Sequence, residues 1–256
     1  MNESNKVTVL KVTLPPPYYR PIKGEDEIFN TNPEQLQPAN SDQTALPAVQ
    51  VRVNQAAPSP PQGLRLIVDY ISHKNSEQSE SGIFFNRGVI KFDHKNFTGA
   101  ITNLKRSIEL DPDNALARYY CGIAKLCLQD YTGAITDFDN VIELNPTVAE
   151  VFFFRGNSKF NLKDYKGARG DYNKAIELNP NYADAYNDRG TAKYYLKDYK
   201  EAKDDYDKAI GLNPTFAEAY SNRGSTKLKL KDKAGAKIDF AKAAELNAKN
   251  KSKQTK

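Results

Sequence analysis

Residue types that support metal, redox or membrane chemistry are scarce in this chain. Its 256 residues include two cysteines, two histidines, one methionine and no tryptophan. Cys121 and Cys127 would point about 240° apart on a helix, so they cannot bridge each other. No CxxC motif or His/Cys cluster offers a ligand set for a metal ion. We therefore expect no cofactor and no metal site, and the two thiols fit a reducing compartment.

Long apolar runs are absent as well. Hydrophobic residues make up 39% of the chain, charged residues 27%, and the mean hydropathy is −0.70. No stretch approaches the roughly 18 consecutive apolar residues that a membrane helix needs. The first residues, Met-Asn-Glu-Ser-Asn, lack the basic-then-apolar order of a secretory signal. We expect a soluble, cytoplasmic protein with no membrane insertion.

Proline is unevenly distributed and divides the chain. Ten of the 14 prolines lie in residues 1–80, whereas the other four, Pro112, Pro146, Pro180 and Pro214, are each 34 residues apart. Charge divides at the same place. Residues 1–80 carry 7 basic and 9 acidic groups, and residues 81–256 carry 30 and 23. Two regions of different character therefore meet near residue 80.

Residues 1–80 are predicted to form a Pro/Gln/Asn-rich leader, extended or disordered, because each proline removes a donor and disfavours helix before it. Three short apolar islands interrupt it: Val7–Leu14, Val49–Val53 and Leu64–Ile71. The last island is ambiguous, since its apolar residues fit both strand alternation and a helical stripe. An island could dock on a partner or on the rest of the chain. A helical Leu64–Ile71 would cap the first unit described next.

A fixed period of 34 residues fills the remainder of the chain. It is carried by a glycine row (Gly88, Gly122, Gly156, Gly190, Gly224) and an alanine row (Ala100, Ala134, Ala168, Ala202, Ala236). A third row holds Leu104, Phe138, Tyr172, Tyr206 and Phe240. Each unit reads as two helices joined by a short polar turn, the second ending before Asp-Pro or Asn-Pro. The recurring glycine, costly inside a helix, predicts close approach of the paired helix.

These residues resemble the tetratricopeptide repeat (TPR) family, whose aromatic, Gly, Ala, aromatic and Pro positions correspond to Phe152, Gly156, Ala168, Tyr172 and Pro180. The resemblance implies an all-α fold, a right-handed α-solenoid of five helix-turn-helix repeats. The units are 81–114, 115–148, 149–182, 183–216 and 217–250, and residues 251–256 form a basic tail. Arg118 and Ala248 depart from the family pattern, so we expect local irregularity in the second and fifth units.

A further departure is an arginine before the repeat glycine, where the family usually has leucine. Arg155, Arg189 and Arg223 are each followed sixteen residues later by an aspartate, namely Asp171, Asp205 and Asp239. We expect a structural Arg–Asp ladder between the two helices of a repeat.

The resemblance also implies that the first helices line a concave groove that binds a partner. The predicted partner-binding residues are Phe85, Val89, Phe92, Tyr119, Ile123, Leu126, Phe153, Asn157, Phe160, Asn187, Thr191 and Tyr194. They are aromatic and aliphatic in units one to three and more polar afterwards. We therefore expect a protein-protein interaction scaffold or adaptor that binds a peptide or helix, mainly through repeats 1–3. These side chains could instead only pack against one another.

Other functions have less support in the sequence. No phosphate-binding, nucleophile or metal motif is present, so we expect no enzyme and no small-molecule substrate. The Lys–Asn pairs that clamp a chaperone's carboxylate tail in some relatives are missing. Two alternatives stay open: the groove is occupied by the N-terminal segment or by a second copy through self-association, or the basic repeats and tail bind nucleic acid, which is less favoured because arginine is sparse in the tail.

Overall fold

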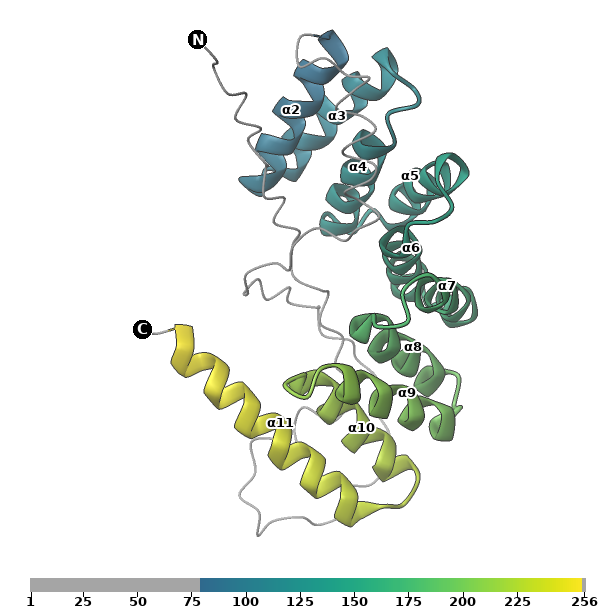
Figure 1. The fold of residues 1–256 in the computed structure, drawn as a ribbon, viewed down its shortest axis with the longest axis vertical. Coiled ribbons are helices and arrows are strands. Elements are labelled where there is room, and N and C mark those ends of the chain that lie inside the picture. The colour runs from purple at the N-terminus through teal and green to yellow at the C-terminus, as the bar shows by residue number, and fades with distance from the viewer. Residues whose placement is uncertain (1–78, 255–256) are drawn as a thin grey trace, which may run out of the picture. The chain divides into compact units, whose positions relative to one another are not determined.

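The structure is a computed structural model that describes residues 79–254, with the backbone alone for residues 251–254. This part of the chain is all-α, and its ten helices are paired in tandem helix-turn-helix repeats (Figure 1). The first helices of the pairs are α2 (Glu80–Asp93), α4 (Ala115–Cys127), α6 (Ala149–Asn161), α8 (Ala183–Tyr195) and α10 (Ala217–Lys229). The second helices are α3 (Phe97–Leu110), α5 (Tyr131–Leu144), α7 (Tyr165–Leu178), α9 (Tyr199–Leu212) and α11 (Lys233–Gln254).

The helices group into two compact units, α2–α7 and α8–α11, each of which is described by itself. The expectations for the leader lie outside the described residues. None of the described helices is long and apolar enough to cross a membrane. The second pair, α4 and α5, has the same helix lengths as the third, so the irregularity expected from Arg118 is absent.

The turn inside each pair is a tight cap that ends one helix and begins the next. In the third pair, the Lys163 N–H donates to the Phe160 carbonyl (2.8 Å) and the Asp164 N–H donates to the Lys159 carbonyl (2.9 Å). This is the Schellman pattern, which requires a left-handed residue, and Lys163 has φ 65°. The Asp164 carboxylate then accepts from the Gly167 N–H and caps α7. The same turn recurs at Lys95, Gln129, Lys197 and Lys231.

The connection between pairs depends on the proline row. The residue before each proline is extended, as at Asn145 (φ −149°, ψ 96°), because proline disfavours the α region in its predecessor. Where Ala248 replaces the fifth proline, nothing stops the helix. As a result α11 runs to Gln254, past the predicted end of the fifth unit at residue 250.

The repeat glycine allows close packing within each pair, as predicted. A Cβ placed on Gly156 would lie 2.8 Å from Cε1 of Tyr172, and one on Gly122 would lie 2.8 Å from Cε1 of Phe138. Because real Cβ atoms do not approach so closely, any larger residue would separate the two helices. The core of each pair is therefore built on a glycine beneath a large side chain, Leu104 in the first pair and an aromatic ring in the other four.

Candidate functional site

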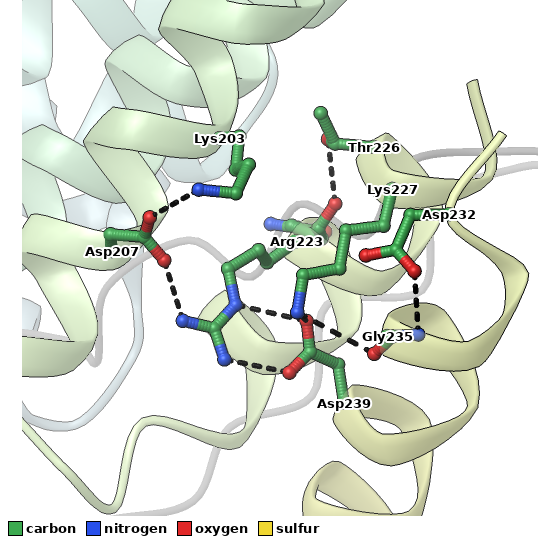
Figure 2. A network of polar contacts seen from close by, with 9 residues as sticks. Lys203, Asp207, Arg223, Thr226, Lys227, Asp232, Gly235 and Asp239 are labelled. Carbon is green, nitrogen blue, oxygen red and sulfur yellow. Dashed lines mark hydrogen bonds and ion pairs between the residues drawn. The ribbon is translucent and has the colours of Figure 1, made fainter. Parts of the chain in front are cut away.

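A charged seam joins the two helices of each pair in the second half of the chain. Arg223 donates from Nε and Nη2 to both carboxylate oxygens of Asp239, at 2.9 and 2.6 Å (Figure 2). Arg155 and Arg189 bind Asp171 and Asp205 with the same two-bond geometry. The predicted Arg–Asp ladder is confirmed in these three repeats. Such paired, charge-assisted hydrogen bonds fix the planar guanidinium in one orientation.

The seam also connects neighbouring repeats within a unit. The third nitrogen of Arg223 donates to Asp207 of α9 at 2.6 Å, and that of Arg155 donates to Asp139 of α5 at 2.6 Å. Lys227 adds a second cation to Asp239 at 2.8 Å (Figure 2). The seam is structural, because it repeats with one geometry and every one of these cations already has a carboxylate.

The predicted partner-binding residues are mostly inside the molecule. All of them except Phe85 and Phe160 are buried: Val89, Phe92, Tyr119, Ile123, Leu126, Phe153, Asn157, Asn187, Thr191 and Tyr194. Tyr119 and Phe153, the expected anchors, are 2% and 1% exposed. These ten side chains pack inside the repeats, the alternative named above, and present no open apolar stripe. Contact of these residues with a partner stays a prediction.

Their burial has a simple cause in the first unit. The Tyr119 ring packs edge-on against Phe154 of the next first helix, with centroids 6.1 Å apart, and against Phe138 of its own pair at 6.4 Å. Phe153 packs in turn against Tyr172 at 5.9 Å. These five rings, the aromatic interface, fill the space where the first helices α4 and α6 meet the second helices α5 and α7. Sequence spacing identified the rows but not this packing role.

In the second unit, hydrogen bonds replace the rings. Asn222 of α10 donates to the side-chain carbonyl of Asn187 of α8 at 3.1 Å, and Asn187 donates to the Glu218 carboxylate at 3.1 Å. The Tyr206 hydroxyl donates to the Thr191 hydroxyl at 3.2 Å. Asn187, Asn222 and Thr191 are each at most 1% exposed. This amide network (Asn187, Thr191, Tyr206, Glu218 and Asn222) joins α8 to α10 by directional contacts.

A row of acidic residues begins the last three first helices. Glu150, Asp184 and Glu218 are 34 residues apart and lie in the first turns of α6, α8 and α10. No side chain caps these helices, since Val148, Tyr182 and Phe216 occupy the cap positions. In contrast, Ser79 and Asn114 cap α2 and α4. We call Glu150, Asp184 and Glu218 the acidic row. Its local role is to place negative charge at the helix N-terminus.

Two members of the acidic row, buried Glu150 and half-buried Asp184, have no counter-ion among the described residues. Glu150 is 7% exposed, and burial raises the pKa of its carboxyl. Burial likewise raises the pKa of Asp184 to about 6. Each carboxylate is bonded only to its own backbone N–H, and neither forms an ion pair with the described residues. Asp171 and Asp239, by contrast, each hold an arginine and a lysine.

A further unsatisfied group lies close to Glu150. The Tyr119 hydroxyl is buried and has no hydrogen-bond partner among the described residues. Burial raises its pKa well above the usual value, and the charge of nearby Glu150 adds to the shift. An uncompensated carboxylate beside an unpaired hydroxyl is costly, so the pair is a natural place for a donor supplied from outside.

Sequence reasoning missed the acidic row, although its 34-residue spacing was visible in the sequence. Burial raises the pKa of the Cys121 thiol to about 12, so it is unreactive. Within residues 79–254 no cluster of His, Cys, Asp and Glu could hold a metal ion.

Comparison with protein families finds repeats throughout this region. Residues 183–216 and 217–250 match the description "Tetratricopeptide repeat", and residues 85–126 and 156–196 match "TPR repeat". Together the matches cover more than half of the chain. A search of curated proteins returned no match.

Solved structures give the same answer for the fold. The crystal structure of MamA is 27% identical with a TM-score of 0.61, covering 64% of this chain and 96% of that one. MamA from Desulfovibrio magneticus RS-1 is 23% identical with a TM-score of 0.64, covering 68% and 98%. YrrB, described as a TPR protein with an unusual peptide-binding site, is 21% identical with a TM-score of 0.57, covering 70% and 91%. On its repeat pattern, its paired helices and these matches, the chain belongs to the tetratricopeptide repeat family.

Proposed function

We propose that the chain is a non-catalytic protein-interaction module that binds a basic peptide segment of a partner along its first helices. Its family is typically a protein-protein interaction module and usually lacks catalysis. Because the aromatic residues pack inside the repeats, we assign the main contact with the partner to the acidic row and not to these rings. Phe85 and Phe160, the two predicted residues that keep exposed area, supply apolar contact beside it.

The observation that carries this proposal is the missing counter-ion at Glu150 and Asp184. At other buried carboxylates the chain itself supplies a cation, as at Asp171 and Asp205. A buried charge left without a partner lowers stability, and selection for folding alone would favour an amide or an apolar group there. A lysine or arginine of a partner peptide would supply the absent cation. The acidic row would therefore bind such a peptide more tightly than one with neutral side chains at the same positions.

The ion pairs of the repeats weaken the alternative in which this region binds nucleic acid. The excess of positive charge in residues 81–256 is not a free basic surface, because many of its cations bind aspartates. Arg155, Arg189 and Arg223 are bound to Asp171, Asp205 and Asp239, and lysines share the same carboxylates. Phosphate binding would have to break these pairs. A groove occupied by the leader or by a second copy stays open, since the leader lies outside the described residues.

The proposal is tested by titrating fluorescent peptides against the full-length protein. One peptide carries lysine and arginine between apolar residues, and its partner peptide carries glutamine at the same positions. We expect the basic peptide to bind more tightly. Glu150→Gln and Asp184→Asn should each weaken its binding about tenfold, which corresponds to about 1.4 kcal/mol.

Glu143→Gln and Glu177→Gln are the matched controls, because these residues are exposed on second helices. Neither should change the affinity. Equal binding of the two peptides, or equal losses in the control and test variants, would refute the proposed role of the acidic row.

A further inference from the structure

The first helix, α2, exposes an apolar face that is covered in every later repeat. Ile90 is 57% exposed and Ile83 is 39% exposed. At the position of Ile90, the later repeats have Ala124, Ser158, Ala192 and Thr226, all 0% exposed. At the position of Ile83 they have Ala117, Val151, Ala185 and Ala219, at most 1% exposed. The first repeat therefore carries larger apolar groups where the others carry mostly small ones, yet leaves them uncovered.

The ion pairs of the later repeats show what normally covers this face. Arg155, between Val151 and Ser158 on one face of α6, reaches Asp139 of the preceding second helix, α5. Arg223 reaches Asp207 of α9 in the same way. Ile83, Arg87 and Ile90 occupy the equivalent face of α2. Among the described residues, no second helix precedes α2 to cover this face.

A segment in phase with such a helix lies just before α2 in the sequence. Shifting α3 back by one 34-residue repeat gives residues 63–76. In this register Asp69 and Tyr70 align with Asp137 and Phe138, and Ile67 aligns with Ile135. Ile71 falls at the position of Asp139, the residue that faces the next first helix. An apolar residue there complements Ile83 and Ile90, as aspartate complements Arg155.

We propose that Leu64–Ile71 docks as a helix across α2, forming the second half of an incomplete repeat that covers Ile83 and Ile90. In this register Ile67 and Ile71 are four residues apart on the side that faces α2, so one helix face can bury both against Ile83 and Ile90. Residues 72–79 connect it to α2 and can span about 25 Å or more, so reach is no obstacle. Tethering at this distance gives an effective concentration of order mM.

A second copy fits this face less well. The end helix α11 has Ala241 at the position of Asp207, so it offers Arg87 no carboxylate there. It also has Lys237 at the position of Lys203, which repels Arg87. The leader segment also offers Arg87 no carboxylate at this position, since Ile71 falls there, but it has Ile67 in place of the lysine and so avoids the repulsion. Its docking would close the array at its first helix.

Disulfide formation in the full-length protein tests the docking directly. Ile71→Cys is combined with Ile90→Cys, and the control combines Val51→Cys with Ile90→Cys; peptide mass spectrometry distinguishes either bridge from Cys121 and Cys127. We expect the Ile71 pair to form a bridge within one chain at least about tenfold faster than the control. Equal rates, or a bridge found only between chains, would overturn the proposal, the latter in favour of a second copy.

Hydrogen exchange provides a second test that needs no cysteine. Ile71→Asp should remove the docked helix, so the amides of α2 around Ile83 and Ile90 should exchange about tenfold faster than in the parent chain. Val51→Asp, a control in another apolar island, should leave them unchanged. Exchange that is unaffected by Ile71→Asp would contradict docking even if all variants fold.

Discussion

The two compact units join their neighbouring first helices with different chemistry at the same repeat positions. Between α4 and α6 the aromatic interface buries Tyr119, Phe153 and Phe154. Between α8 and α10 the amide network links Asn187 to Asn222 and Glu218. Aromatic rings stabilise mainly through buried area and tolerate small shifts, whereas amides stabilise through directional bonds that fix one register. One backbone thus accepts two kinds of side-chain interface.

The difference shows which features the repeat itself requires. The glycine seam, the Schellman turn and the Arg–Asp ladder are present on both sides of the comparison. The side chains between neighbouring first helices differ from one unit to the other, and so do the charged residues beside them. The acidic row belongs to this variable part, and we propose it as the place where the partner binds.

The largest expected effect separates the two interfaces. Phe153→Ala should lower the free energy of unfolding by about 3–5 kcal/mol, because a fully buried ring leaves a cavity. Asn222→Ala should lower the free energy of unfolding by about 1–3 kcal/mol, because it removes hydrogen bonds to groups that stay buried. Chemical denaturation followed by circular dichroism measures both. Equal losses would mean that the two interfaces contribute alike.

The pH dependence of the second unit gives the next largest effect. The folded pKa of Asp184, about 6 against an ordinary 3.8, means that the folded state holds its proton more strongly. Stability should therefore fall as the pH rises from about 4 through 6, by up to about 3 kcal/mol at pH 7. The variant Asp184→Asn has no ionisable group at this position, so its stability should not show this fall with rising pH. Unfolding of both proteins at pH 5 and pH 7 checks it, and parallel pH profiles would contradict it.

A double-mutant cycle on the ladder should give an intermediate value. Arg223→Leu, Asp239→Leu and the double variant should show a coupling of about 1–3 kcal/mol, because the two-bond contact is largely shielded from water. The exposed pair Lys242 and Glu245 is the control, with an expected coupling much smaller than that of the ladder. Equal couplings would mean that the ladder is no stronger than a surface ion pair.

The smallest effect concerns the turn that both units share. Lys163→Gly should raise the free energy of unfolding by about 0.5–1 kcal/mol, because glycine adopts the left-handed conformation without steric cost. Lys208→Gly, at an exposed site inside α9, should instead lower it by about 1 kcal/mol. Thermal unfolding distinguishes the signs. A loss at both positions would show that the lysine side chain itself stabilises the turn.

The sequence predicted the architecture well because periodic signals report backbone geometry. The proline, glycine and alanine rows gave the paired helices, and the spacing of Arg223 and Asp239 gave the ladder. The site was predicted poorly for a physical reason. Helical spacing identifies a face but not what covers it, so Tyr119 and Phe153 looked exposed although neighbouring helices bury them. Glu150 was overlooked because a first-turn acid has a routine structural role.

The most direct test of the acidic row measures stability and affinity on one variant. At pH 7, Asp184→Asn should raise the free energy of unfolding, because it removes a half-buried charge that has no counter-ion among the described residues. The same variant should weaken binding of a lysine- and arginine-bearing peptide about tenfold. Opposite signs for stability and binding are what the account predicts. A variant that loses stability while binding the peptide as tightly as its parent would contradict it.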